Sequence, residues 1–203
     1  VLDTLALDDG AYDLTLTVEA MAPSAGVSSL DERLGGAPVL SQATRRVVVH
    51  NWEFLIDELL PPQNLGWLGT REALKSIDRS DGWSHATGQA DDFFGDADRL
   101  APAPGSAQYI TWQLPALHSF AVIVYSRDER ALAGLRIEVS ADGTNWHDAG
   151  YEARAVGVSR AGWHRHELVG AAPAGEWSYV RLLVDGNAAL QLGEVRLVGR
   201  AGR

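Results

Sequence analysis

The amino-acid sequence predicts an all-β protein built as an antiparallel sandwich. Apolar and polar residues alternate with a period of two along most of the chain, whereas the 3.6-residue period of an amphipathic helix is nearly absent. About eight short alternating segments follow one another between residues 77 and 200, separated by Asp-Gly, Gly and Pro turns. Many short strands with turns at close intervals are typical of an antiparallel sandwich.

The N-terminal segment predicts two strands. Residues Tyr12–Glu19 alternate cleanly after a turn at Asp8–Gly10, where glycine supplies the positive φ that such turns need. A loop of small residues over 22–43 separates this strand from its expected partner, Thr44–His50. Because two strands do not hold themselves together in water, we expect them to dock on the rest of the chain or to belong to a truncated sandwich.

A connector and then a longer series of strands follow. Residues 53–76 contain Pro61-Pro62 and are predicted as a connector, with short helical turns at Glu53–Leu60 and Thr70–Lys75. The sequence therefore predicts three parts, residues 1–52, 53–76 and 77–203. The strands expected in the last part are Trp83–Ala86, Gln108–Leu114, Ser119–Ser126, Leu135–Ser140, Glu152–Val158, Trp163–Leu168, Ser178–Val184 and Leu190–Val198.

Charge and composition exclude several function classes. The chain has 27 acidic and 17 basic residues, and this net charge of −10 repels nucleic-acid backbones. No apolar run approaches the roughly 20 residues of a membrane-spanning helix. The absence of cysteine excludes disulfides, thiolate metal sites and cysteine nucleophiles. No leader segment opens the chain, so we expect it to be a piece of a longer, secreted protein.

Two sets of motifs resemble known modules. LDTLALDDGAYDLTLTVEA followed by RRVVVHN is similar to the closing strands of immunoglobulin-like modules in secreted bacterial enzymes. Further on, Val139–Trp146 (VSADGTNW), Tyr179–Leu182 (YVRL) and Glu194–Gly199 (EVRLVG) occur in an order that resembles the galactose-binding-like jelly roll. Discoidin, the coagulation-factor C domains and many bacterial carbohydrate-binding modules have this fold. The resemblance implies a jelly-roll β-sandwich, and the missing cysteine pair favours the bacterial modules.

An acidic loop is the candidate metal site. Its carboxylates are Asp91, Asp92, Asp96 and Asp98. Hard oxygen ligands at this density suit Ca²⁺. In similar modules a structural calcium ion sits at this loop and takes a glutamate from the last strand, so the resemblance implies Ca²⁺ held by Asp92, Asp96 and Glu194. The alternative is a solvated acidic turn in which Asp96 or Asp98 pairs with Arg99.

Tryptophans and their polar neighbours give the candidate ligand site. Trp112 and Trp146 lie in or directly after strands, which predicts that both are buried in the core. An indole outside the core stacks on the C–H face of a sugar, while Arg, His and Asp bond its hydroxyls. The alternative is a set of half-buried tryptophans without a ligand. The candidate saccharide-binding residues are Trp163, His164, Arg127, Asp128, Arg160, Trp83 and His85.

No enzyme motif is present in the sequence. It contains no G-x-S-x-G elbow, no H-E-x-x-H, no P-loop and no dinucleotide fingerprint. His164 and His166 lie two residues apart on one strand face, which is too few ligands for a zinc site. We therefore expect no intrinsic catalysis.

These observations predict a non-catalytic carbohydrate-binding module of a larger secreted polysaccharide-active enzyme. Its partners would be a poly- or oligosaccharide and the catalytic domain of a glycoside hydrolase or polysaccharide lyase in the same chain. One alternative is a spacer that binds nothing, and another is a discoidin-like module that binds a protein or a cell surface. An exposed apolar pair at one loop end favours the surface-binding alternative, and a groove with tryptophan beside arginine and histidine favours saccharide.

Overall fold

The computed structural model describes residues 10–19, 40–49, 51–186 and 189–200. The chain divides into two units, residues 1–51 and 52–203. The predicted turn residues Asp8 and Asp9, and most of the predicted loop over 22–43, lie outside the described residues. Within the described part of the chain, none of the helical segments has the length and hydropathy of a membrane span.

The first unit is an antiparallel pair of strands. β1 (Gly10–Glu19) pairs with β2 (Leu40–Val49), from Gly10 opposite Val49 to Glu19 opposite Leu40. Across the pair, the Arg46 guanidinium lies 3.1 Å from the Asp13 carboxylate. Both predicted strands are therefore present and pair with each other.

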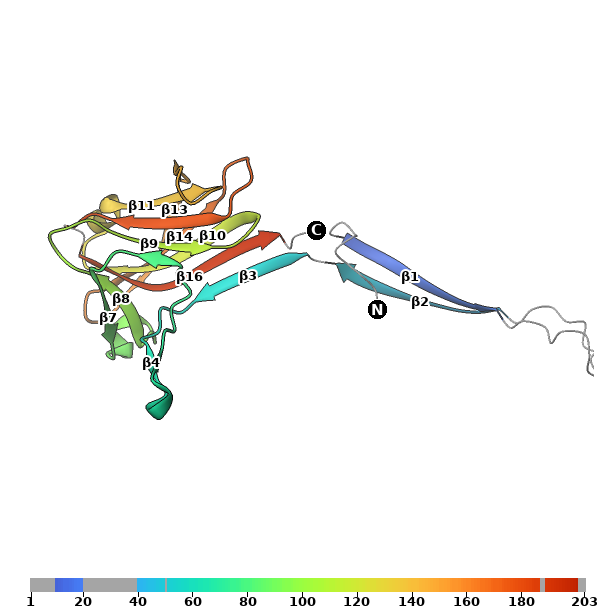
Figure 1. The fold of residues 1–203 in the computed structure, drawn as a ribbon, viewed down its shortest axis with the longest axis horizontal. Helices are drawn as coiled ribbons and strands as arrows, with labels where there is room; N and C mark the ends of the chain where they lie inside the picture. Colours follow the sequence, from blue (N-terminus) through green and yellow to red (C-terminus); the bar gives the residue numbers. More distant parts are fainter. Residues whose placement is uncertain (1–9, 20–39, 50, 187–188, 201–203) are drawn as a thin grey trace, which may run out of the picture. The chain divides into compact units, whose positions relative to one another are not determined.

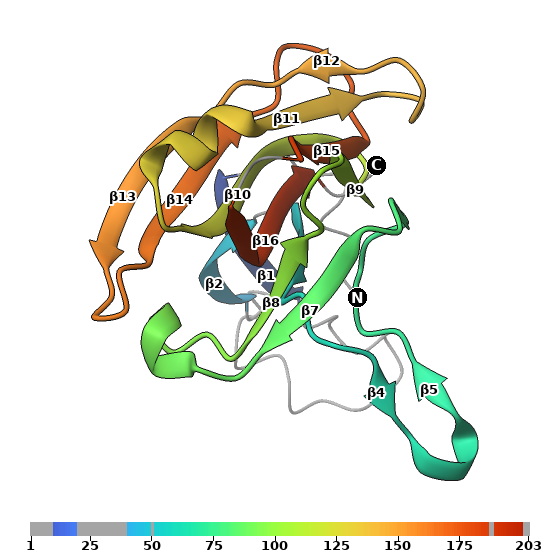
Figure 2. The ribbon, with the colours of Figure 1, turned by 90° about the vertical axis from the view of Figure 1, so that its left-hand side faces the viewer.

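The second unit is a sandwich of two antiparallel sheets (Figures 1 and 2). The larger sheet runs in the order β13 (Glu152–Val158), β14 (His164–Ala171), β10 (Leu117–Ser126), β16 (Leu190–Arg200), β8 (Asp98–Pro102) and β7 (Trp83–Thr87), and β3 (Trp52–Asp57) also pairs with β16. The smaller sheet runs in the order β12 (His147–Asp148), β11 (Leu135–Ser140), β15 (Tyr179–Val184), β9 (Gln108–Gln113) and β6 (Asp78–Arg79). This arrangement confirms the predicted all-β, antiparallel jelly-roll fold.

Alternating side chains from both sheets fill the core. On β10, Phe120, Val122 and Val124 point inward and are buried with the inward residues of β11 and β15. Trp112 on β9 is fully buried, as predicted. The prediction that Trp146 is buried is wrong, because the loop after β11 folds over the outside of the smaller sheet. There the Trp146 ring is half-buried, 4.0 Å from the Arg181 guanidinium carbon.

The predicted helical turn over Glu53–Leu60 is also wrong, since most of this segment belongs to β3. Its backbone pairs with β16 from Trp52 opposite Arg200 to Asp57 opposite Val195. The segment obeys period two, because Leu55 packs against the core while Phe54 and Ile56 stay exposed on the other face.

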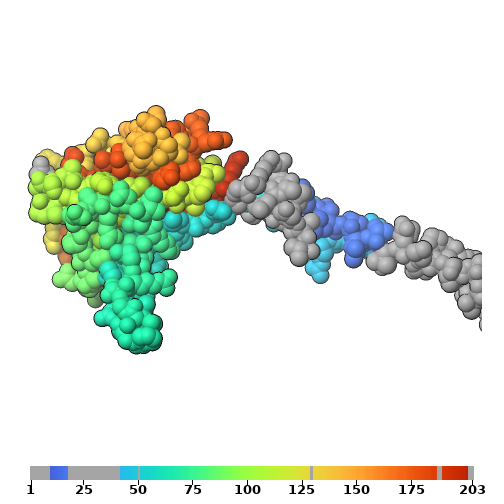
Figure 3. All heavy atoms as spheres, viewed as in Figure 1, coloured from blue at the N-terminus to red at the C-terminus, as the bar shows by residue number. Residues whose placement is uncertain are grey.

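A short hairpin replaces the helical turn predicted at Thr70–Lys75. β4 (Gln63–Asn64) pairs with β5 (Thr70–Arg71) around the 3₁₀ turn η2 (Gly66–Leu68). Gly66 and Gly69 have φ of +65° and +87°, a region that favours glycine. Figure 3 shows this hairpin standing out from the body of the unit. Its tip carries three exposed apolar side chains, Leu65, Trp67 and Leu68, and Trp67 is 93% exposed.

Gly170 on β14 is expected to tolerate no larger residue. A Cβ atom there would lie 2.7 Å from Cε2 of Phe120 and 2.9 Å from the Gly150 carbonyl oxygen. We expect Gly170→Ala to lower the free energy of unfolding by about 1–3 kcal/mol through overpacking. Urea denaturation measures the change. Gly10→Ala is the control, because its Cβ would have no neighbour nearer than 3.8 Å, and equal stability of the two variants would contradict the explanation.

Candidate functional site

A tight turn between β13 and β14 positions Trp163. The Ser159 amide donates to the Trp163 carbonyl at 2.8 Å, and the Ser159 hydroxyl accepts the Trp163 amide at 3.2 Å. Gly162 takes a φ of +79°, which glycine adopts without strain. The turn therefore fixes the backbone of Trp163 immediately before β14.

Two neighbours hold the indole ring in place. Arg127 follows β10 directly, and its Nη1 donates to the Ala161 carbonyl at 3.0 Å. Its guanidinium carbon lies 4.8 Å from the centre of the Trp163 ring, a cation–π distance. The Phe93 ring lies 4.8 Å from the same indole and is tilted by 41°. Trp163 is half-buried by these contacts, so only part of its surface remains open.

The open part of Trp163 faces a pocket of about 430 Å³. This volume is within the usual range of roughly 300–1,000 Å³ for small-ligand pockets. The other walls come from the end of β8 and the start of β16, with Pro102, Pro104, Leu190 and Gln191. We call this the Trp163 pocket.

The structure gathers only some of the predicted saccharide-binding residues. Arg127 touches Trp163, and exposed Arg160 lies on the same β13–β14 turn. Asp128 is exposed, and its carboxylate accepts the Arg130 amide at 2.9 Å, capping the 3₁₀ helix η4 (Glu129–Gly134). His164 stacks in parallel on His166, with 6.1 Å between ring centres, and does not line the pocket.

Trp83 and His85 lie on β7 and not in the Trp163 pocket. The Trp83 indole N–H donates to the Tyr109 carbonyl at 2.8 Å, and its ring packs against the sandwich core. The Nδ1 atom of His85 is buried and has no hydrogen-bond partner among the described residues. The structure therefore assigns Trp83 to packing.

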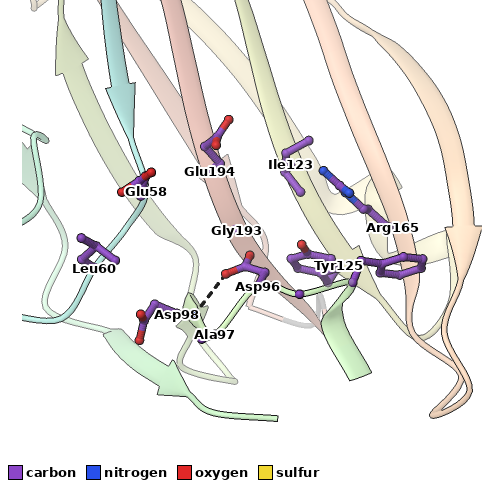
Figure 4. Close-up of a pocket in the computed structure, with 12 residues that line it drawn as sticks. Glu58, Leu60, Asp96, Ala97, Asp98, Ile123, Tyr125, Arg165, Gly193 and Glu194 are labelled. Atoms are coloured by element: carbon purple, nitrogen blue, oxygen red, sulfur yellow. Dashed lines mark hydrogen bonds between the residues drawn. The ribbon is translucent and has the colours of Figure 1, made fainter. Parts of the chain in front are cut away.

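A second pocket, of about 340 Å³, lies on the outer face of the larger sheet (Figure 4). The pairing of three strands builds the floor of this pocket. Ile123 on β10 lies opposite Glu194 on β16, and Tyr125 on β10 lies opposite Arg165 on β14. Asp96, from the loop before β8, completes this Asp96 pocket. The sequence reasoning missed Tyr125 and Arg165, although their outward positions in alternating strands were a usable signal.

Burial raises the pKa values of two side chains in this pocket, Asp96 and Tyr125. The Asp96 carboxylate accepts the Asp98 amide at 3.1 Å and a hydrogen bond from the Tyr125 hydroxyl. Desolvation nevertheless raises the pKa of Asp96 above its ordinary value. Burial and the Asp96 charge also raise the pKa of Tyr125. Arg165 Nε is buried without a hydrogen bond to any described residue, while Glu194 pairs with Arg196.

The three predicted calcium ligands do not form one set. Asp96 and Glu194 line the Asp96 pocket, whereas Asp92 lies on the 3₁₀ turn η3 (Ala90–Phe93) outside its lining. Among the residues that the structure describes, no group of three or more His, Cys, Asp or Glu is gathered closely enough to hold a metal ion.

The Arg99 side chain holds the acidic loop by hydrogen bonds to the loop's main-chain carbonyls. Its Nη1 donates to the Asp96 main-chain carbonyl at 2.6 Å and its Nη2 to the Gly88 carbonyl at 3.0 Å. Its guanidinium carbon lies 3.6 Å from the Phe93 ring centre, and the residue is only 2% exposed. These hydrogen bonds join Arg99 to the two ends of the loop, so the arginine has a structural role there.

Comparisons with known proteins show a distant likeness to two solved modules. No family model matches the chain, and no curated protein matches it. The C-terminal CBM6 of LamC, a marine laminarinase from Zobellia galactanivorans, is 9% identical, with a TM-score of 0.36, over 73% of this chain and 100% of that one. A CBM6 carbohydrate-binding module from Cellvibrio mixtus lichenase 5A, solved with cellotriose, is 10% identical, with a TM-score of 0.35, over 63% of this chain and 93% of that one.

Proposed function

We propose that this chain is a non-catalytic saccharide-binding module, and that it serves a larger secreted glycoside hydrolase or polysaccharide lyase. The observation that supports this most is the Trp163 pocket, where an indole held by Arg127 and Phe93 borders a ligand-sized hollow. A fixed aromatic ring beside a cation offers a saccharide both a stacking surface and a directional hydrogen-bond donor.

The binding mode follows from these groups. The indole contacts the C–H face of one sugar unit. The Arg127 guanidinium, which touches the indole but does not itself line the pocket, donates to the hydroxyl oxygens of that sugar where it extends past the indole. Arg127 spends one N–H on the Ala161 carbonyl, which fixes the direction of the remaining donors. Tethering such a module to a catalytic domain raises the local concentration of polysaccharide at that domain.

The test is affinity electrophoresis through gels that contain laminarin, mixed-linkage β-glucan, hydroxyethylcellulose or xylan. We expect at least one polysaccharide to retard the protein, and calorimetry with the matching oligosaccharide, cellotriose included, to give its affinity. Migration that is unchanged in every gel would favour the spacer alternative.

A second candidate function is supported by the exposed tip of the β4–β5 hairpin. Leu65, Trp67 and Leu68 are 44%, 93% and 66% exposed. Apolar side chains concentrated at a protruding tip are typical of contact with another surface. The discoidin-like alternative would use this tip to bind a protein or a cell surface. Retention on whole cells that Trp67→Ala abolishes, without any saccharide retardation, would favour it.

The calcium proposal rests on the resemblance alone, because the described carboxylates are not gathered into a metal-binding group. We expect a chelator to lower the melting temperature by several degrees and added Ca²⁺ to restore it, because an ion that binds only the folded state stabilises it by mass action. Thermal melts of metal-stripped protein measure this effect. Asp96→Asn should abolish the response, and identical melts with and without chelator would remove the calcium proposal.

A further inference from the structure

The outer face of the smaller sheet carries a third hollow, of about 330 Å³. None of the predicted saccharide-binding residues lines it. Three of its lining residues are aromatic and half-buried, and we call it the aromatic hollow. Its main lining residues are Tyr109, Trp146, Tyr179, Arg181, Thr111 and Asp78.

The strands of the smaller sheet build the floor of the aromatic hollow. On β15, Tyr179 and Arg181 alternate with the buried residues Val180 and Leu182, so they point away from the core. Arg181 pairs in register with Thr111 on β9, and Thr111 pairs with Asp78 on β6. Figure 2 shows β11, β15 and β9 in the layer that forms this face. The floor therefore extends across the three adjacent strands β15, β9 and β6.

A rigid turn holds the Trp146 wall. The Asp142 carboxylate accepts the amides of Thr144 and Asn145, both at 2.8 Å, and the Asn145 side-chain amide at 2.7 Å. These hydrogen bonds lower the pKa of Asp142, which keeps it a charged acceptor. Gly143 has a φ of +75° and lies against the Tyr179 ring, since a Cβ there would be 3.6 Å from it. The wall is thus fixed before any ligand arrives.

The arginine of the hollow is already paired, and its Asp78 carboxylate accepts a hydrogen bond from a neutral hydroxyl. Arg181 Nη2 lies 2.6 Å from the Glu138 carboxylate, and the two side chains are only 24% and 16% exposed. The Tyr109 hydroxyl hydrogen-bonds the Asp78 carboxylate, and Gln113 Nε2 donates to the Tyr179 hydroxyl at 3.1 Å. A neutral ligand therefore meets polar groups at fixed positions, with the Asp78 carboxylate as a hydrogen-bond acceptor and with the lining arginine already paired.

We propose that the aromatic hollow is a second saccharide-contact site, which takes a neutral oligosaccharide. Three aromatic residues and neighbouring hydroxyl, amide and carboxylate groups supply stacking and hydrogen bonding together. The inference rests on the proposed saccharide-binding function. A protein partner is disfavoured because a stable interface needs roughly 800 Å² per partner, whereas this hollow is small and exposed Asp142 directly precedes its lining residue Gly143. Two sites would let one module hold two chains or two stretches of one chain.

The test is amide chemical-shift mapping of the full chain with cellohexaose, laminarihexaose and xylohexaose. Residues 109–111, 143–146 and 179–181 report the aromatic hollow, and residues 101–105, 163 and 189–191 report the Trp163 pocket. The variants are Tyr179→Ala and Trp146→Ala for the hollow, and Trp163→Ala for the pocket. Arg136→Ala, an exposed change on the same sheet, is the control.

We expect at least one hexasaccharide to shift both sets of residues. Tyr179→Ala and Trp146→Ala should weaken binding at the hollow at least tenfold, while Trp163→Ala and Arg136→Ala leave it unchanged. Shifts at the Trp163 pocket alone would overturn the second site and keep the proposed function. Shifts at the hollow alone would move the binding site there. No shifts with any probe, or concentration-dependent shifts at the hollow without sugar, would overturn the inference, and the latter would indicate contact between copies of this chain.

Discussion

Asp57→Ala is expected to lower the free energy of unfolding by about 3–5 kcal/mol, a large part of the 5–15 kcal/mol that stabilises a typical domain. Asp57 is 1% exposed and ends β3. Its carboxylate accepts the Leu59 amide at 3.1 Å, the Lys75 amide at 2.9 Å and the Trp112 indole N–H at 2.8 Å. Alanine would leave these three donors without their acceptor, and two of them are backbone amides.

The hydrogen bonds of Asp57 join distant parts of the chain. Lys75 lies at the end of the predicted connector, and Trp112 is the largest fully buried side chain of the core. Removing the carboxylate therefore loosens both the connector and the core at once. Urea denaturation followed by tryptophan fluorescence measures the loss of stability.

Two further variants make this prediction specific. Asp91→Ala is the matched control, because Asp91 is exposed on η3, and it should change stability by less than about 0.5 kcal/mol. Asp57→Asn keeps one acceptor oxygen and should fall between the wild type and Asp57→Ala. If Asp57→Ala is as stable as Asp91→Ala, the carboxylate does not hold the connector to the core.

The alternating pattern predicted most of the sandwich because each strand carries its own signal. The predicted strands Leu135–Ser140 and Glu152–Val158 coincide with β11 and β13, and Ser119–Ser126 lies within β10. β3 was missed for a physical reason. Its partner, β16, follows more than a hundred residues later, and nothing local in a charged segment before two prolines reveals that pairing. Long-range pairing is decided by the whole fold.

The candidate site was predictable only where the pairing of two adjacent strands brings its residues together. Arg127 and Trp163 meet because β10 and β14 pair so that Ser126 faces His164, and residues next to a paired strand end share one edge. Trp146 shows the limit of such reasoning. A strand followed by an Asp-Gly turn indicates a reversal, but the turn residues do not tell to which side of the sheet the loop folds. The aromatic hollow therefore appears only in three dimensions.

Trp163→Ala is expected to weaken saccharide binding by about 1–3 kcal/mol, or about 5–150-fold in affinity. The variant removes the aromatic wall of the Trp163 pocket and the surface on which the Arg127 guanidinium lies. Calorimetry with the oligosaccharide that matches the retarding polysaccharide measures the loss. Trp67→Ala is the matched control, because that indole is 93% exposed on the β4–β5 hairpin and contributes no wall to the pocket.

The packing of Trp163 must be separated from its contact with ligand. Its ring lies 4.8 Å from Phe93, so alanine also leaves a gap beside a buried phenyl group, and the thermal melt of each variant reports this cost. Trp163→Phe refills most of the gap and keeps an aromatic face, so it should restore the melting temperature and recover part of the affinity. Arg127→Ala removes the hydrogen-bond donor but leaves the indole, and should weaken binding without lowering stability by more than about 1 kcal/mol, because Arg127 is exposed. If Trp163→Ala melts like the wild type and keeps its full affinity, saccharide does not bind in the Trp163 pocket, and the aromatic hollow becomes the principal site.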